Sequence, residues 1–148
     1  EVFFVPFAGV SIGWAEYAAR VRQALEPLGV SVRSAGEVDD PLAAARSAEA
    51  FMVGGGNTFQ LLRMMYSTGL RAVFQERVRA GTPYLGWSAG SNLACPTIRT
   101  TNDMPVVEPP SLDALGLVPF QINPHYTDRV LDHHGGETRD ERIAEFLI

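Results

Sequence analysis

One serine in this chain lies in a sequence context that can make it a nucleophile. Ser88 is the central residue of a G-x-S-x-G pentapeptide, residues 86–90, which follows a strand-like apolar run and precedes small helix-forming residues. In a strand–turn–helix elbow such glycines let neighbouring backbone approach, while the serine hydroxyl is exposed at a sharp turn. The same string also occurs in ordinary turns, so the pentapeptide alone leaves both interpretations open.

A serine hydroxyl needs a base to remove its proton, and the chain contains three histidines. His125 is the best candidate because it comes just after residues 118–122, an apolar run that we expect to be a strand. That strand would bring His125 to the sheet edge where Ser88 lies. The alternative is a histidine that only hydrogen-bonds at a strand end.

The other two histidines, His133 and His134, are adjacent and lie near Asp132 and Glu137. Such a cluster could suggest a metal site, but neighbouring histidines in a polar loop rarely hold a preformed coordination geometry. We therefore expect neither a metal nor another cofactor. The irregular stretch 128–136 that contains them could serve as a mobile lid.

A carboxylate and an oxyanion hole would complete a hydrolase site. Asp103 lies between the serine and the histidine in chain order, as the acid does in one group of α/β hydrolases, although it could equally cap a turn. The carboxylate would orient the imidazole and stabilise its charged form. The N–H of Ala89 and a second N–H from Gly55 or Gly56 would bind the oxyanion, each contributing about 3 kcal/mol in the transition state.

Strands and helices alternate along the chain and must position these groups. The expected strands are residues 2–7, 30–32, 50–53, 83–87 and 118–122, and the expected helices are residues 11–28, 42–48, 58–66, 70–79, 138–147 and a short one after Ser88. This order predicts an α/β fold with three layers, a mostly parallel sheet with helices on both faces. Ligands bind beyond the carboxyl ends of such strands, where the glycine turn 54–56, the serine turn and His125 should meet.

Length and charge narrow the class of function. The 148 residues correspond to about one domain, and the net charge of −5 argues against a nucleic-acid partner. No apolar stretch approaches the ~20 residues that a bilayer requires, and no signal peptide is visible. A single cysteine, Cys95, agrees with a reducing compartment. We expect a cytoplasmic protein that acts on a small or peptide-like substrate.

Five ordered blocks of sequence resemble the S51 family of serine peptidases. They are residues 8–10, 54–62, 86–90, 94–105 and 121–125, and the resemblance covers nearly the whole chain. It implies a fold like that of the class I glutamine amidotransferases, with serine where those enzymes carry cysteine. It also implies hydrolysis of dipeptides that have an N-terminal aspartate.

The resemblance assigns roles residue by residue. Ser88 matches the nucleophile, His125 the base, and Asp103 an aspartate assigned as the relay acid. A second assignment within the family places this acid on a glutamate in a Pro-Glu-Gly stretch, which here would fall beyond Ile148. The chain also begins at what would be the second strand of the family. We therefore expect residues 1–148 to be a single α/β peptidase domain that is a central fragment, without the first strand and helix and without the C-terminal part.

The aspartate of the substrate needs a cation, and the planar fork of arginine holds a carboxylate with two parallel hydrogen bonds. Arg139 matches an arginine near the site in the family and is the first choice, with Arg99 second. Arg139 could instead form an ordinary ion pair on a solvated helix face. Asn57 could add an amide contact to the substrate.

The sequence therefore predicts a metal-free serine exopeptidase that cleaves Asp-Xaa dipeptides through an acyl-enzyme on Ser88. One alternative is a related serine peptidase that acts on β-aspartyl or cyanophycin-type substrates. Another is a non-catalytic module that binds a nucleotide phosphate on the glycine turn 54–56, although the spacing fits no common phosphate motif. The oligomeric state, a homodimer included, stays open.

Overall fold

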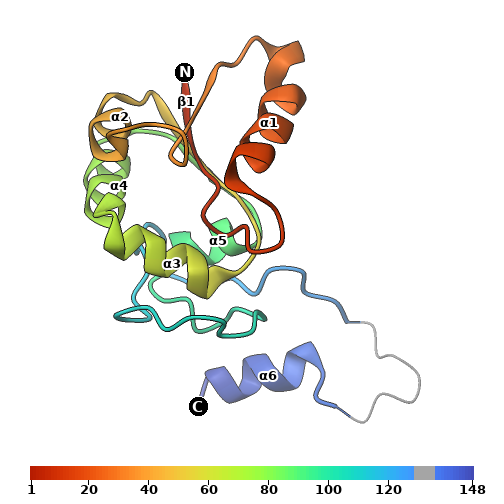
Figure 1. Cartoon of the computed structure of the whole chain (residues 1–148). Helices are drawn as coiled ribbons and strands as arrows, with labels where there is room; N and C mark the ends of the chain where they lie inside the picture. The colour runs from red at the N-terminus through yellow and green to blue at the C-terminus, as the bar shows by residue number, and fades with distance from the viewer. Residues whose placement is uncertain (129–135) are drawn as a thin grey trace.

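The computed structural model describes residues 1–128 and 136–148 (Figure 1). His133, His134 and Asp132, which raised the question of a metal site, lie outside the described residues. Most of the stretch 128–136, which could have formed a lid, lies outside them as well.

Within these residues, four parallel strands form one sheet in the order β2-β1-β3-β4. The strands are β1 (Val2–Val5), β2 (Val32–Ser34), β3 (Ala50–Val53) and β4 (Tyr84–Gly86). The helices are α1 (Trp14–Leu25), α2 (Pro41–Ser47), α3 (Thr58–Ser67), α4 (Leu70–Arg79), α5 (Ala89–Ala94) and α6 (Arg139–Phe146), and a 3-10 turn (Glu26–Leu28) extends α1. Because β1 lies between β2 and β3, the connection from β1 to β2 and the connection from β3 to β4 run in opposite directions across the sheet.

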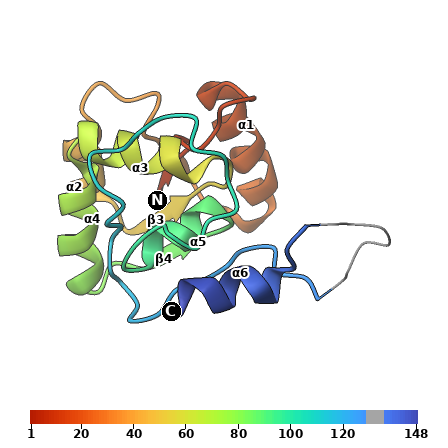
Figure 2. The same ribbon diagram turned by 90° about the horizontal axis from the view of Figure 1, so that it is seen from below.

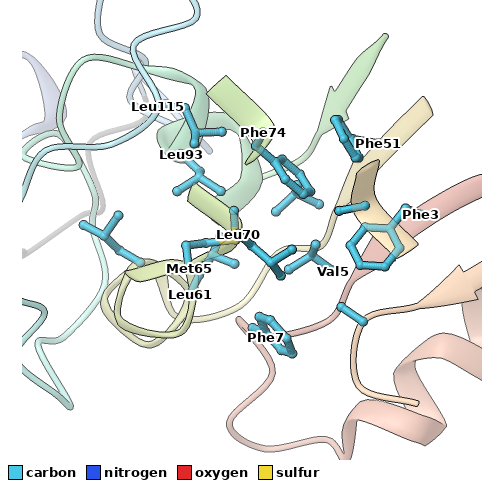
Figure 3. Packing of buried hydrophobic residues seen from close by; sticks show 14 of the residues in the cluster. Phe3, Val5, Phe7, Phe51, Leu61, Met65, Leu70, Phe74, Leu93 and Leu115 are labelled. Carbon is cyan, nitrogen blue, oxygen red and sulfur yellow. The ribbon is translucent and has the colours of Figure 1, made fainter. Parts of the chain in front are cut away.

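The two faces of the sheet are covered by different helices, which confirms the expected three-layer α/β fold. Alternate residues of a strand point to opposite faces. Phe4 of β1 packs with α1 on one face, together with Ala18 and Val21. Phe3 and Val5 point to the other face, where they join the core formed with α2, α3, α4 and α5 (Figure 3).

Local signals in the sequence explain where several helices begin. The side chain of Asp40 accepts a hydrogen bond from the N–H of Ala43, and Pro41 occupies the first position of α2. At α6, Thr138 and Glu141 form the expected capping box, in which each side chain binds the backbone N–H of the other. The expected starts of both helices are therefore confirmed.

The expected strand at residues 118–122 is wrong. Residues 118–120 form a bend and the segment joins no ladder, and Phe120 is 56% exposed. The carbonyl of Ile122 instead accepts hydrogen bonds from the side chains of Asn92 and Thr100. Since Pro119 has no N–H and side chains bind the backbone that a neighbouring strand would need, a β-forming composition alone does not make a strand here.

The helix α6 lies outside the layered body in both views (Figures 1 and 2). None of its residues is buried. It begins at Arg139, the arginine expected to bind the substrate, so its placement bears directly on the site described below.

A cavity of about 530 Å³ opens at the carboxyl edge of the sheet, between the loop that follows β1 and the loop that follows β3. Its lining includes Gly9 and Ile12 from the first loop and Gly55 and Gly56 from the second. The chain leaves β1 and β3 in opposite directions at this point, which is where open α/β sheets bind ligands.

No helix in the described part of the chain combines the length and the apolar composition needed to cross a bilayer. Nor do these residues contain a group of three or more His, Cys, Asp or Glu side chains that could hold a metal ion.

We expect Phe51→Ala to destabilise the full-length protein by about 3–5 kcal/mol, because the ring is fully buried and its removal leaves a cavity. Its ring stacks on that of Phe74, with 3.9 Å between the ring centroids. Chemical denaturation measures the effect, with Phe120→Ala as the matched control at an exposed position. Equal losses of stability in the two variants would contradict this description of the core.

Candidate active site

Ser88 lies at a tight turn between β4 and α5, as the pentapeptide predicts for a nucleophile elbow. Its φ of 54° lies in the left-handed region, which few residues other than glycine adopt. The flanking glycines are needed because a Cβ at Gly86 would lie 2.5 Å from the carbonyl oxygen of Gly90. A Cβ at Gly90 would lie 2.3 Å from the carbonyl oxygen of Val53. No larger residue fits at either position without a shift of backbone.

His125 lies beside this serine, with 2.9 Å between its Nε2 and the Oγ of Ser88. Like Ser88, His125 has a positive φ, here 58°. The distance is within hydrogen-bonding reach and lets the imidazole accept the proton of the hydroxyl. The structure therefore brings together the two groups on which a serine nucleophile depends.

Side-chain hydrogen bonds hold the segment that carries His125. The carbonyl of Ile122 accepts from Asn92 Nδ2 at 2.8 Å and from Thr100 Oγ1 at 2.7 Å. The carbonyl of Pro124, directly before the histidine, accepts from Asn102 Nδ2 at 3.0 Å. Asn92 is itself buried on α5, so the helix that begins after Ser88 also fixes the segment that carries His125.

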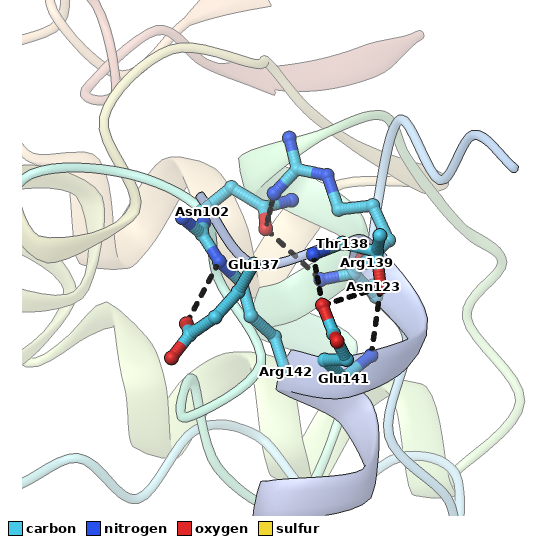
Figure 4. A network of polar contacts seen from close by, with 7 residues as sticks. All are labelled: Asn102, Asn123, Glu137, Thr138, Arg139, Glu141 and Arg142. Carbon is cyan, nitrogen blue, oxygen red and sulfur yellow. Dashed lines mark hydrogen bonds and ion pairs between the residues drawn. The ribbon is translucent and has the colours of Figure 1, made fainter. Parts of the chain in front are cut away.

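Further amide contacts link this segment to α6 (Figure 4). Asn123 donates to the carbonyl of Thr100 at 2.9 Å and to Oδ1 of Asn102 at 3.1 Å. Arg139, the first residue of α6, donates from Nη1 to the same Oδ1 of Asn102. The guanidinium is thus connected to the histidine segment through one amide side chain.

The glycine turn 54–56 lies against Ser88, since a Cβ at Gly55 would lie 3.0 Å from the Cβ of Ser88. Gly56 has a φ of 135°, and a Cβ there would lie 2.2 Å from the carbonyl oxygen of Ala8. Within the described part of the chain, the N–H groups of Gly56 and Ala89 have no hydrogen-bond acceptor. The N–H of Ala89 is unpaired because it opens α5. Two unpaired backbone donors near a serine are what an oxyanion hole requires.

Asp103 does not reach the imidazole. Its Oδ2 accepts from the N–H of Thr58 at 2.8 Å, from Thr58 Oγ1 at 2.5 Å and from Thr101 Oγ1 at 3.0 Å. Among the described residues, no hydrogen bond joins it to His125. The carboxylate thus fixes the first turn of α3, and its role as the relay acid stays a prediction.

Asn57 also has structural partners. Its Oδ1 accepts from the N–H of Gln60 at 3.0 Å as the cap of α3, and its Nδ2 donates to the carbonyl of Met104 at 2.8 Å. The residue lines the 530 Å³ cavity, but both ends of its amide are already engaged. A contact between Asn57 and substrate stays a prediction.

Of the two predicted arginines, the structure connects only Arg139 to the histidine segment, through Asn102. Arg99 is exposed and lines a separate cavity of about 470 Å³, together with Arg142 of α6. Neither Ser88 nor His125 lines that cavity or the 530 Å³ cavity, so the comparison of the two arginines rests on the contact between Arg139 and Asn102. The geometry thus favours Arg139 over Arg99 as a residue of the site.

The sequence reasoning missed the polar side chains that support the site. Tyr17 received no separate role from the sequence, although its hydroxyl donates to the carbonyl of Gly55. Nor did Asn92 receive a role, and a polar residue within the short apolar helix after Ser88 is a signal that could have identified it. Asn102 also received no role, because the neighbouring Asp103 was the candidate acid.

We expect Gly90→Ala to destabilise the full-length protein by roughly 3 kcal/mol, because its Cβ would overlap the carbonyl of Val53 in the sheet. Gly13→Ala is the control, since a Cβ there meets nothing within 4 Å and the loss should stay below about 1 kcal/mol for a changed helix cap. Thermal and chemical unfolding measure both variants. A Gly90→Ala protein as stable as the control would show that the elbow is not as tightly packed as described.

Comparison with known proteins gives a consistent result. A model of peptidase family S51 matches residues 1–148. The peptidase E of Salmonella typhimurium (strain LT2) is 56% identical over 145 residues, which are 98% of this chain and 63% of the relative. The chain thus spans less than two thirds of the length of that relative.

Solved structures agree with the observed layers. A crystal structure of a candidate peptidase E protein from Listeria monocytogenes EGD-e superposes with a TM-score of 0.76 and 31% identity, over 97% of this chain and 73% of that chain. A glutamine amidotransferase superposes with a TM-score of 0.54 over 78% of this chain and 52% of that chain, and at 19% identity it supports the fold alone. These neighbours confirm the expected glutamine amidotransferase-like fold. The chain belongs to peptidase family S51.

Proposed function

We propose that this chain carries the nucleophile and the base of a serine exopeptidase that hydrolyses Asp-Xaa dipeptides. The observation that carries the proposal is the 2.9 Å contact between Ser88 Oγ and His125 Nε2. Membership of family S51 and the 56% identity to a peptidase E support the same reaction class.

The reaction proceeds through an ester on the serine. Ser88 Oγ attacks the carbonyl carbon of the scissile peptide bond while His125 Nε2 takes the hydroxyl proton. The resulting oxyanion is stabilised by the N–H groups of Gly56 and Ala89. When the tetrahedral intermediate collapses, the C–N bond breaks and His125 returns the proton to the leaving amine. Water then attacks the aspartyl ester by the same route, with His125 as base, and restores Ser88.

Recognition of the aspartate falls to Arg139. Its side chain reaches Asn102, whose amide holds the carbonyl before His125, so the guanidinium is tied to the catalytic segment. A guanidinium binds a carboxylate through two parallel charge-assisted hydrogen bonds, which gives geometric selectivity as well as energy. An arginine tied to the base in this way supports a requirement for an acidic side chain next to the cleaved bond.

We expect Ser88→Ala to lower kcat/KM for Asp-Leu by on the order of 10⁴-fold or more, because alanine has no hydroxyl to form the acyl-enzyme. The assay uses the full-length protein, and labelling by a fluorophosphonate probe should be lost in parallel. Ser67→Ala, which removes an exposed hydroxyl at the end of α3, is the control and should behave as wild type. Turnover by Ser88→Ala close to the wild-type rate would remove the proposed mechanism.

We expect Arg139→Ala to lower kcat/KM for Asp-Leu by roughly 10- to 100-fold and to change that for Ala-Leu much less. The physical reason is the loss of a charge-assisted interaction, worth about 1.5–3 kcal/mol, that only the acidic substrate makes. Steady-state kinetics on the two dipeptides measure the difference.

The matched control is Arg142→Ala, one turn further along α6, where the side chain pairs with Glu137. It should leave the ratio of the two substrates unchanged. Equal losses on Asp-Leu and Ala-Leu in Arg139→Ala would instead assign this arginine to the support of Asn102. Faster wild-type cleavage of the β-linked isomer of Asp-Leu would favour the β-aspartyl alternative.

A further inference from the structure

Tyr17 of α1 reaches across the sheet edge to the glycine turn beside the nucleophile. Its hydroxyl donates to the carbonyl oxygen of Gly55 at 3.2 Å and accepts from the indole Nε1 of Trp87 at 3.1 Å. Trp87 is the residue directly before Ser88. One phenol therefore bridges the turn that follows β3 and the turn that follows β4.

The packing around this phenol leaves it little freedom. Its ring packs edge to face on Phe4, with 5.2 Å between the ring centroids, and the indole of Trp87 stacks on the same phenylalanine at 6.0 Å. A Cβ at Gly54 would lie 2.7 Å from the hydroxyl oxygen, so glycine at this position makes room for the tyrosine. Tyr17 thus has a defined position relative to the turn.

The carbonyl that Tyr17 binds belongs to the same peptide unit as the N–H of Gly56. A trans peptide is planar, with its C=O and its N–H on opposite sides, so fixing the oxygen also fixes the direction of the N–H. The N–H of Gly56 has no acceptor among the described residues. Hydrogen bonds along a chain of dipoles also strengthen one another, so a bound carbonyl makes the opposite N–H a better donor.

The hydroxyl is in the protonation state that this contact requires. Burial raises the pKa of Tyr17 above its ordinary value, and the hydrogen bond from Trp87 offsets only part of the rise. At neutral pH the phenol therefore keeps its proton and can donate it to the carbonyl of Gly55. Tyr17, Gly55 and Gly56 all line the 530 Å³ cavity at the sheet edge.

We propose that Tyr17 is a positioning residue that orients the Gly55–Gly56 peptide unit and thereby presents the N–H of Gly56 to the oxyanion. The inference rests on the proposed function, since it assigns a task in the same reaction. Trp87 assists by holding the hydroxyl from the other side. A preorganised donor stabilises the transition state more than the bound substrate, because the charge on the oxygen develops only there.

The test is Tyr17→Phe in the full-length protein, which removes one oxygen and keeps the ring. We expect kcat for Asp-Leu to fall roughly tenfold, less than the 10²–10³-fold typical of a lost oxyanion donor, because Gly56 keeps its N–H but not its orientation. KM should change by less than about twofold, whereas a general loosening of the site would also raise KM. Tyr66→Phe is the matched control, since that hydroxyl donates to the backbone carbonyl of Asp113 and Tyr66 does not line this cavity.

A second measurement does not depend on activity. In ¹⁵N-labelled protein, the amide signal of Gly56 should shift in Tyr17→Phe and stay in place in Tyr66→Phe. Should Tyr17→Phe fail to fold, Trp87→Phe takes over both measurements, because it removes the N–H that holds the Tyr17 hydroxyl and retains a ring against Phe4.

The outcomes separate the inference from the function on which it rests. An active wild type with a Tyr17→Phe variant of unchanged kcat and an unshifted Gly56 amide overturns the inference alone. A wild type that neither cleaves Asp-Leu nor reacts with the serine probe overturns the proposed function, and the inference with it. A lower kcat at constant KM together with a shifted Gly56 amide supports both.

Discussion

The contact between the Ser88 hydroxyl and the His125 imidazole is the constraint on which the rest of the site depends, and the two partners are delivered by different means. Ser88 is covalently continuous with β4 and α5, and close backbone packing around Gly86 and Gly90 fixes its turn. No strand precedes His125 directly, so the side-chain amides of Asn92 and Asn102, rather than the hydrogen bonds of a β ladder, hold its backbone in place. Each mode of support fails differently, one through added volume and the other through a lost hydrogen bond.

These two modes of support meet at Asn92. This buried amide lies on the helix that starts directly after Ser88, and it binds the backbone three residues before His125. A buried amide that lost its partner would cost about 1–3 kcal/mol, so the contact is costly to break. The serine and the histidine therefore share one rigid frame, although 36 residues lie between them in the sequence.

Much of the sheet could be predicted from the sequence because its causes are local. Apolar runs identify β1 and β3, Asp40 and Thr138 mark helix starts by their capping chemistry, and the pentapeptide 86–90 identifies the elbow. His125 lies beside Ser88 as expected, but the strand invoked to bring it there is not formed. A strand needs a partner edge, and side-chain amides far away in the sequence already bind this segment.

The contacts of Asp103 also depend on residues that are distant in the sequence. Its position in chain order suggested a relay to histidine, and its residue type was equally compatible with a cap. Which groups its carboxylate binds depends on where Thr58 and Thr101 lie, which is a property of the folded chain. The role of Tyr17 could not be predicted for a related reason. At helical spacing a tyrosine is grouped with apolar residues, and only the folded structure shows that its hydroxyl binds the carbonyl of Gly55.

Ser88 and His125 both have backbone conformations that suit glycine better than an L-amino acid with a side chain. Each such conformation costs of order 1–3 kcal/mol, which the surrounding packing must offset. A fold selected only for thermodynamic robustness would place glycine at both positions. Under the proposed function, selection for catalysis and selection for stability act in opposite directions at these two residues, and a screen for stability alone would replace Ser88 and His125 first.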